Sequence, residues 1–268
     1  MTERHEITTR KVLYEIPGMD SVQVRRDVPY NESDSGSLTF DIYYPPDSRT
    51  KGRDPVVVFV IGFSDIGAQA MLGCRFKEME SYISWAKLSA MSGIAAITYS
   101  TGKDPAADVQ EVLRYIRQNT ALLGIDKDRI GIWSCSGNVP NALSVLIQDP
   151  EIKCAALCYG YTLDLEGAAD VAAASQQFRF VNPCAGKSVA DLSQTTPLFL
   201  LRAGRDETPG LNETLDRFAK AAVARNLPLT LLNHPEGTHA FDLTEDSENC
   251  REVIRNILSF LRFHLMNK

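Results

Sequence analysis

The sequence lacks the long apolar run that a membrane-spanning helix requires. No stretch of about eighteen consecutive apolar residues occurs in the 268-residue chain. The first residues, Met-Thr-Glu-Arg-His-Glu, are polar and do not form the apolar segment of a signal peptide. We therefore expect a cytoplasmic protein with no membrane partner.

Basic charge is also scarce. Lys and Arg number 28 against 34 Asp and Glu, which gives a formal net charge of −6. A nucleic-acid-binding protein would need a basic patch, so we expect no nucleic-acid partner. No G-x-G-x-x-G turn opens a helix after the first buried strand, and this excludes a dinucleotide-binding module.

Cysteine is present, but without a metal-binding spacing. No C-x-x-C pair occurs, and Cys154 and Cys158 straddle a strand-like run. This is not a zinc pattern, so we expect no metal. In the absence of an export signal, we expect reduced and mostly buried thiols, with disulfides as the alternative. The six cysteines are Cys74, Cys135, Cys154, Cys158, Cys184 and Cys250.

The most informative segment is residues 129–141, Arg-Ile-Gly-Ile-Trp-Ser-Cys-Ser-Gly-Asn-Val-Pro-Asn. A short β-branched run ends in a cluster of small residues, and an apolar-periodic stretch follows from Val139 to Ile147. This order predicts a strand, a sharp turn and a helix. A serine at the tip of such a turn projects its hydroxyl beside a helix N-terminus, where negative charge is favoured. The layout is that of a nucleophile elbow.

Three residues compete for the tip of this turn, where the positions two before and two after must be small. Centring on Ser136 places Ser134 and Asn138 at those positions. Centring on Cys135 places the bulky Trp133 before the tip, and centring on Ser134 also places a bulky residue there. Ser136 is therefore the favoured nucleophile. Asn138 stands where G-x-S-x-G has its second glycine, and asparagine tolerates unusual backbone angles.

Strands and helices alternate along the chain, which predicts an α/β fold with a mostly parallel central sheet flanked by helices. The first two strands are expected to form an antiparallel hairpin. No internal repeat or linker occurs, so we expect one domain over residues 1–268. Residues 160–192 carry no clean strand and are interpreted as a small lid-like insertion. The expected strands lie near residues 21–28, 37–44, 56–61, 94–99, 129–135, 153–159, 197–203 and 228–232, and the expected helices near 76–91, 104–116, 139–147, 208–222 and 253–265.

A serine hydroxyl needs a base that takes its proton and a third group that orients the base. Only four histidines occur. His239 lies in a loop between the last expected strand and the last expected helix, and is favoured over His234 at the end of that strand. Asp206 follows another strand at its carboxyl end and is the favoured acid, with Glu207 as the runner-up. The chain order serine, acid, histidine is the one expected of an α/β-hydrolase.

Acyl transfer also needs hydrogen-bond donors for the oxygen that becomes negatively charged. One expected donor is the backbone N–H of Gly137, the residue after the nucleophile. The other is expected in the loop after the buried strand, at Gly62, Phe63 or Ser64. Backbone donors of this kind each contribute about 3–4 kcal/mol to the transition state.

At these segments the chain resembles the α/β-hydrolase superfamily, in particular small serine esterases and dienelactone-hydrolase-like proteins. Residues 126–138 are similar to the family's approach to the elbow, and residues 56–64 to the strand that leads to its oxyanion loop. Residues 198–206 and 237–241 look like its acid and histidine segments. The resemblance runs from about residue 56 to the C-terminus, and the first 50 residues fit the family's opening strands less distinctively.

Two departures from the family's pattern affect the site. Ser134 and Asn138 replace the elbow glycines, and Ile-Gly-Phe-Ser at residues 61–64 replaces the common His-Gly-Gly-Gly. A side chain at Phe63 would narrow the acyl pocket or shift the oxyanion donors. Dienelactone hydrolases use cysteine as the nucleophile, which keeps Cys135 as the alternative nucleophile.

The resemblance implies a serine hydrolase that cleaves the carboxylic ester of a small molecule through an acyl-enzyme and needs no cofactor. A peptidase or a thioesterase would use the same three residues. The alternative from another class is a catalytically silent hydrolase fold that binds a ligand or a partner. A monomer or a homodimer is expected. The residues expected to contact substrate are Gly62, Cys135, Trp133 and Tyr161, and Trp133 and Tyr161 either line an apolar acyl pocket with Phe178 and Phe180 or belong to the core.

Overall fold

The computed structural model describes residues 4–33, 36–48 and 53–267 of the chain. Its centre is an eight-stranded sheet of order β1-β2-β4-β3-β5-β6-β7-β8. Strand β2 is antiparallel to both its neighbours, and the sheet from β4 through β3 to β8 is parallel. The predicted mostly parallel α/β architecture is confirmed. The strands are β1 Gln23–Ser33, β2 Gly36–Tyr44, β3 Asp54–Phe59, β4 Ala95–Tyr99, β5 Ile125–Cys135, β6 Ala155–Cys158, β7 Leu198–Ala203 and β8 Leu229–His234.

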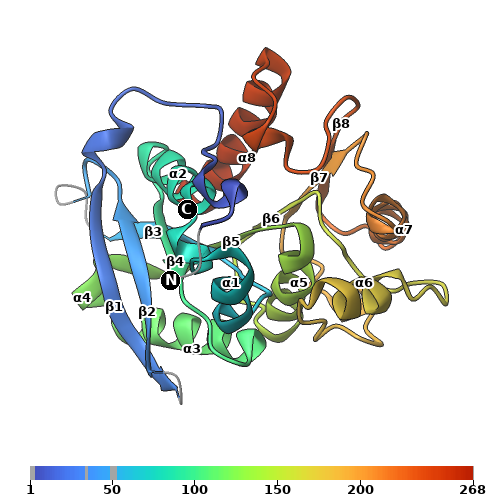
Figure 1. Ribbon diagram of the computed structural model, residues 1–268, viewed down its shortest axis with the longest axis horizontal. Helices are drawn as coiled ribbons and strands as arrows, with labels where there is room; N and C mark the ends of the chain where they lie inside the picture. The colour runs from blue at the N-terminus through green and yellow to red at the C-terminus, as the bar shows by residue number, and fades with distance from the viewer. Residues whose placement is uncertain (1–3, 34–35, 49–52, 268) are drawn as a thin grey trace.

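Helices cover both faces of this sheet. Helices α2 and α8 lie on one side of it and α3 and α5 on the other (Figure 1). The α-helices are α1 Asp65–Leu72, α2 Glu80–Met91, α3 Pro105–Gln118, α4 Thr120–Leu123, α5 Val139–Gln148, α6 Asp170–Phe178, α7 Leu211–Ala224 and α8 Glu248–Met266. The 3-10 helices are η1 Glu6–Thr9, η2 Met19–Ser21, η3 Phe76–Glu78, η4 Ser136–Asn138, η5 Val189–Asp191 and η6 Phe241–Leu243.

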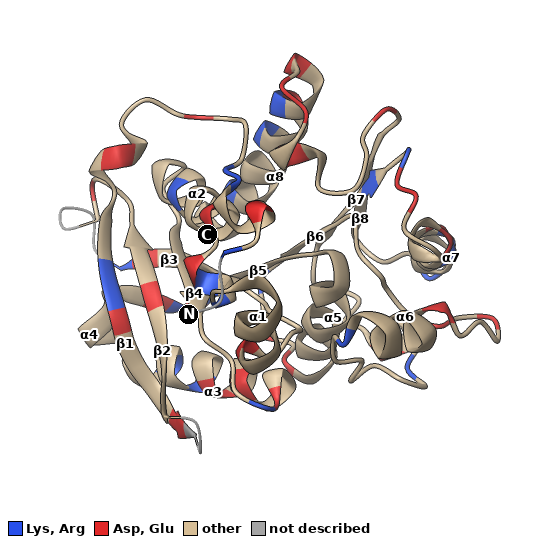
Figure 2. Ribbon diagram, viewed as in Figure 1, with Lys and Arg blue, Asp and Glu red and all other residues tan. Residues whose placement is uncertain are grey.

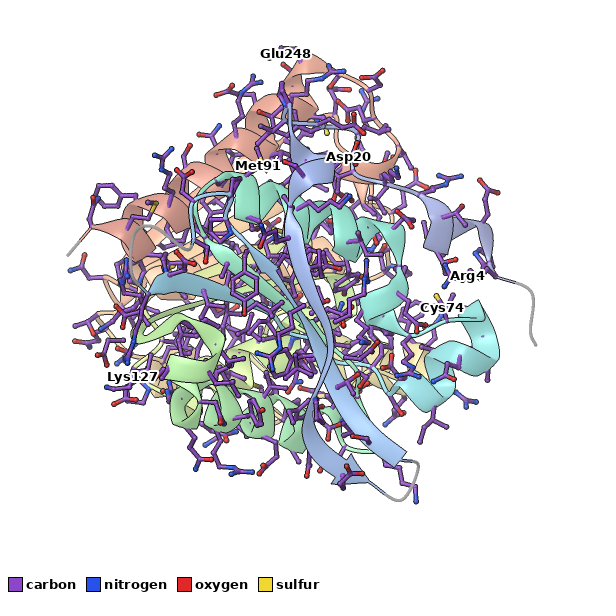
Figure 3. All side chains as sticks on the ribbon, turned by 90° about the vertical axis from the view of Figure 1, so that its left-hand side faces the viewer. Arg4, Asp20, Cys74, Met91, Lys127 and Glu248 are labelled. Carbon is purple, nitrogen blue, oxygen red and sulfur yellow. The ribbon has the colours of Figure 1, made fainter. Side chains whose placement is uncertain are left out.

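The central strands are continuously apolar because both their faces are covered. Every residue of β3, β4 and β6 is buried, whereas the edge strand β8 is exposed at three of its six positions. At the opposite edge, the hairpin of β1 and β2 crosses the face of the molecule seen in Figure 3. The two edges therefore leave the middle of the sheet, at β3 and β5, as its most enclosed part.

The direction of the chain through the sheet reverses between β3 and β5. After β3 the chain continues to β4 on one side, and it then returns past β3 to form β5 on the other side. Loops that leave the carboxyl ends of two such strands diverge and open a crevice, which is where parallel α/β sheets bind ligands. The two segments at this point are the loop of residues 60–64 and the elbow at Ser136.

Several helix boundaries differ from the sequence-based expectation. Helix α1 occupies a stretch for which no element was predicted, and the Ser64 hydroxyl caps its first turn by accepting from the Ile66 N–H at 3.3 Å. With only eight residues and a glycine inside it, α1 gives a weak periodic signal. The helix expected from Thr208-Pro209 begins later, at α7, because Asp206 and Thr208 form a turn and Gly210 becomes the N-cap with φ of 73°.

Residues 160–192 contain α6 and η5 and lie beside the site. They contribute most of a small apolar cluster that is separate from the main core. The Phe63 side chain packs against this cluster from the loop after β3. The segment therefore contacts the oxyanion loop directly, and its action as a lid stays a prediction. The cluster consists of Tyr161, Val171, Ala174, Phe180 and Leu211.

Positive and negative residues are interspersed over the described part of the chain. Lys and Arg are scattered among Asp and Glu along the ribbon (Figure 2), in keeping with the net charge of −6. All six cysteines are free; five are buried and Cys135 is half-buried. Within the described parts of the chain, no helix has the length and apolar character needed to cross a membrane.

Candidate active site

Ser136 occupies the tip of the turn between β5 and α5. Its φ of 56° lies in the left-handed region, which a non-glycine residue adopts only under local constraint. The residue before it, Cys135, is extended with φ of −142°, so the chain bends sharply at Ser136 itself. This strained strand-to-helix turn is the geometry of a nucleophile elbow. It places the Ser136 hydroxyl at the carboxyl end of β5, beside the N-termini of η4 and α5.

The structure brings the three expected catalytic residues into one hydrogen-bonded chain. Ser136 Oγ lies 2.9 Å from His239 Nε2, and His239 Nδ1 lies 2.6 Å from Asp206 Oδ2. The Asp206 side chain is fully buried, whereas the His239 side chain is 34% exposed. The acid therefore orients the histidine from beneath, while the face of the ring toward Ser136 stays accessible.

The electrostatics of Asp206 favour its ionised form. Burial alone would raise the pKa of this carboxyl. Hydrogen bonds from His239 and Thr208, together with the His239 charge, outweigh that effect and lower the pKa below its usual value. The Thr208 N–H donates to Asp206 Oδ1 at 3.0 Å and leaves Oδ2 for the histidine. A carboxylate held in this way fixes the ring so that Nε2 faces the serine.

The alternative residues are engaged elsewhere. His234 is only 3% exposed, and its Nε2 lies 3.0 Å from Glu245 Oε2. Glu207 is exposed, and among the described residues no hydrogen bond or ion pair joins it to His239, which pairs with Asp206. The buried Ser134 hydroxyl donates to the Val60 carbonyl oxygen at 3.1 Å. In Cys135, burial raises the pKa of the thiol to about 12, so the thiol is protonated near neutral pH.

The expected oxyanion donors lie on two backbones that meet at the elbow. Gly137 follows Ser136 at a helix N-terminus, where N–H groups lack intrahelical acceptors. Opposite it, Phe63 lines both cavities that contain Ser136, whereas Ser64 lines only the larger one. The Ser64 hydroxyl donates to the Gly102 carbonyl oxygen at 2.6 Å and caps α1, so this side chain is committed to the fold.

Two cavities of about 550 Å³ and 440 Å³ meet at Ser136 and His239. The larger one has aromatic walls and includes Trp133 and Cys135, both expected to contact substrate. Tyr161 lines the smaller one, together with Phe178 and Phe180 of the 160–192 segment. The aromatic residues that line the larger cavity are Phe63, Phe76, Tyr82, Trp85, Trp133 and Tyr159.

Gly62 packs closely against the elbow. It lines neither cavity, because its Cα faces the elbow: a Cβ built on Gly62 would lie 2.9 Å from the Gly137 carbonyl oxygen and 3.0 Å from Asn138 Cα. Any side chain at this position would push the two backbones apart. Gly62 therefore allows close packing of the loop after β3 against the elbow, and its contact with substrate stays a prediction.

Two site residues, Tyr159 and Asp242, gave no signal in the sequence. The Tyr159 ring packs edge-on against His239 at 5.5 Å between centroids, and its hydroxyl donates to Asp242 Oδ1 at 2.7 Å. Trp85 Nε1 donates to the other Asp242 oxygen at 2.8 Å. Burial raises the pKa of Asp242 despite these donors. Tyr159 directly follows β6 and Trp85 lies in α2, both far from the histidine loop in sequence, and only the fold brings them together.

Asn138 also differs from its expected role. Its φ of −85° and ψ of −20° are ordinary right-handed helical values, so the turn does not need the conformational freedom of glycine or asparagine at this position. The strained residue of the elbow is Ser136. In the described ranges, no group of three or more His, Cys, Asp or Glu side chains is arranged to hold a metal ion.

Comparison with known proteins shows which solved structures share this fold. No protein-family model matches the chain, and no curated protein matches its sequence. Among solved structures, an α/β-hydrolase from the metagenome of Lake Arreo in Spain is similar to it, with 19% identity, a TM-score of 0.69, and coverage of 91% of this chain and 83% of that one. The esterase LipW from Mycobacterium marinum has 17% identity, a TM-score of 0.68, and coverage of 92% and 83%.

A fungal structure is similar over an even larger share of both chains. Carboxyl esterase 2 from the mycorrhizal fungus Tuber melanosporum has 14% identity, a TM-score of 0.70, and coverage of 97% of this chain and 92% of that one. Together with the sheet order and the elbow, these similarities show that the chain has the α/β-hydrolase fold. The fold predicted from the sequence is confirmed.

Proposed function

We propose that this protein is a serine-dependent esterase that cleaves a carboxylic ester of a small molecule through an acyl-enzyme. The observation that carries the proposal is the hydrogen-bonded chain from Ser136 through His239 to Asp206, with distances of 2.9 Å and 2.6 Å, at a strained elbow. Several of the similar structures are esterases, which agrees with this reaction class.

In the first half of the reaction, Ser136 Oγ attacks the ester carbonyl carbon while its proton passes to His239 Nε2. Asp206 stays ionised and stabilises the imidazolium that forms. The carbonyl oxygen becomes an oxyanion, which accepts hydrogen bonds from the N–H groups of Gly137 and Phe63. The tetrahedral intermediate then collapses: the bond to the alcohol oxygen breaks, His239 returns its proton to that oxygen, and Ser136 keeps the acyl group.

In the second half, water takes the place of the alcohol. His239 Nε2 removes a proton from the water, the water oxygen attacks the acyl carbon, and the bond from that carbon to Ser136 Oγ breaks. His239 gives the proton back to Ser136, and the carboxylic acid leaves. Each proton transfer uses the same ring nitrogen, so one histidine serves as base and then as acid.

The two cavities suggest how the ester lies across the site. They meet at Ser136, so the acyl part and the alcohol part of an ester can extend into different cavities. The larger cavity of about 550 Å³ is lined mostly by aromatic and aliphatic side chains. A small-molecule ester with an apolar group fits this site, because burial of apolar surface favours binding.

The test is turnover of p-nitrophenyl esters of increasing acyl length. We expect hydrolysis that is lost in Ser136→Ala and in His239→Ala, by about 10⁴-fold or more in kcat for the serine variant. His264→Gln is the matched control, because His264 lies on α8 and lines neither cavity. Full activity in Ser136→Ala would refute the serine mechanism. Turnover of thioesters or peptides instead of esters would reassign the substrate class.

A further inference from the structure

Asn138 connects three segments at the elbow through its side-chain amide. Its Oδ1 accepts from the Gly62 N–H at 2.8 Å. Its Nδ2 donates to the Cys135 carbonyl oxygen at 2.9 Å and to the Tyr82 hydroxyl at 3.1 Å. The residue is 3% exposed, so no water competes for these bonds. The amide thus ties the loop after β3 and helix α2 to the turn that carries Ser136.

The loop that Asn138 holds has one free donor. Among the described residues, every backbone N–H and C=O of residues 61–63 has a hydrogen-bond partner except the N–H of Phe63. Most backbone groups of a fold are paired, so the unpaired N–H of the half-buried Phe63, a residue that lines both cavities with Ser136, is available to a ligand. In order along the loop, the partners are the Tyr99 hydroxyl, the Asn141 amide, the Asn138 amide oxygen, the Val181 N–H and the Thr101 hydroxyl.

Two hydrogen bonds restrain the peptide groups on either side of Gly62: its N–H donates to Asn138 Oδ1 at 2.8 Å, and its carbonyl oxygen accepts from the Val181 N–H at 2.8 Å. The N–H of Phe63 belongs to the planar peptide group that follows Gly62. Gly62 has no side chain of its own to restrict rotation about its backbone bonds. Val181 therefore holds the peptide plane that carries the Phe63 N–H, and the amide oxygen of Asn138 anchors the preceding plane to the elbow, one residue after Gly137. The Asn138 bond thus sets where the Phe63 N–H lies relative to the Gly137 N–H.

We propose that Asn138 is a positioning residue that sets the N–H of Phe63 against the N–H of Gly137, so that both donors converge on one oxyanion. The inference rests on the proposed esterase function and extends it to the residue that departs from the family's G-x-S-x-G pattern. In this chain the second glycine of the pattern is replaced by an asparagine whose amide supports the oxyanion donors. Replacing Asn138 by glycine should therefore lower the rate of ester hydrolysis.

The direct test is Asn138→Gly, assayed with an ester and with the matching thionoester, in which sulfur replaces the carbonyl oxygen. We expect kcat for the ester to fall about 10²-fold with little change in KM, because a misplaced donor weakens only the transition state. Sulfur accepts hydrogen bonds poorly, so the thionoester gains little from the donors. The ratio of ester to thionoester turnover should therefore fall in the variant, whereas general damage to the fold lowers both rates together.

Two further variants serve as controls for this test. Ser134→Gly restores the other glycine of the pattern, but the Ser134 hydroxyl contacts Val60 and not the loop of residues 61–63, so we expect wild-type kcat and an unchanged ratio. Asn138→Asp keeps an oxygen that accepts from Gly62 and should retain more activity than Asn138→Gly. If the glycine variant does not fold, Asn138→Ala provides the same comparison with Asn138→Asp.

The outcomes separate this inference from the proposed function. If the wild type hydrolyses esters and Asn138→Gly keeps the wild-type kcat and ratio, the positioning role is wrong and the esterase proposal stands. Equal losses for ester and thionoester also overturn the positioning role. If the wild type hydrolyses no ester and Ser136 reacts with no acylating reagent, the proposed function itself fails.

Discussion

Cys135 is the alternative nucleophile, and it directly precedes Ser136 in the chain. The reactivity of its thiol therefore distinguishes a thiol-dependent enzyme from a serine-dependent one. Burial, together with the nearby Asp242 carboxylate, raises the pKa of the Cys135 thiol to about 12. At pH 8 a thiol with that pKa is ionised in about one molecule in 10⁴, whereas an ordinary thiol is ionised to roughly a quarter. Only the thiolate reacts with iodoacetamide, so we expect Cys135 to be alkylated about 10³-fold more slowly than free cysteine.

The assay follows ester turnover during iodoacetamide treatment and counts adducts by intact mass. The native protein should keep its activity, and the chain unfolded in urea should take up six adducts, one for each cysteine. Cys135→Ala should retain most of its kcat, because the thiol makes no hydrogen bond to His239 among the described contacts. Rapid inactivation of the native protein with the label on Cys135 would refute the reasoning.

Three further predictions concern packing, catalysis and charge. Gly62→Ala should lower the free energy of unfolding by about 1–3 kcal/mol in urea titrations, since its Cβ would lie 2.9 Å from the Gly137 carbonyl oxygen; unchanged stability would argue against that contact. Asp206→Asn should lower kcat about 10⁴-fold in steady-state assays, because the histidine loses its orienting carboxylate. Burial raises the pKa of Asp108 to about 6, above its unfolded value, so the folded form holds the proton more tightly. As the pH rises from 4 to 7, the free energy of unfolding of the wild type should therefore fall by about 1–2 kcal/mol more than that of Asp108→Asn. A rise of the wild type relative to the variant would show that the pKa of Asp108 is lowered by folding and not raised.

The sequence was sufficient to predict the elbow because its signals are local. A β-branched run, a cluster of small residues and an apolar-periodic stretch are adjacent around Ser136, and they form β5, η4 and α5. The grouping of Asp206 and His239 with Ser136 needs only one further rule, that parallel strands present their carboxyl ends at one edge of the sheet. Both residues do follow strands, β7 and β8, at that edge.

The supporting contacts could not be predicted in the same way. From the sequence, Asn138 is interpreted only as a residue that replaces glycine imperfectly. Its side-chain amide, however, forms hydrogen bonds with Gly62 and Tyr82, which lie 76 and 56 residues away. Asp242 likewise depends on Trp85, 157 residues distant. Such partners are set by how α2 and the loop after β3 pack on the elbow, and residue spacing carries no information about that packing.

Local signals also failed where two of them competed. Thr208-Pro209 has the sequence of a helix start, but the Thr208 N–H donates to Asp206 and the helix begins at Leu211 instead. The hydrogen bond that helps to lower the pKa of Asp206 thus delays the helix. At this position the hydrogen bond that holds Asp206 takes precedence over the helix start that Thr208-Pro209 favours. Sequence propensity alone does not reveal this competition.

The most direct test of the account is the reaction of the native protein with a fluorophosphonate, which phosphonylates only an activated serine. Peptide mass spectrometry should find a single adduct, on Ser136, formed with loss of fluoride. The adduct should be absent in Ser136→Ala and should form far more slowly in His239→Ala, because the hydroxyl then lacks its base. A label on any other residue, or an unlabelled Ser136 in a protein that hydrolyses esters, would contradict the proposal that Ser136 is the nucleophile.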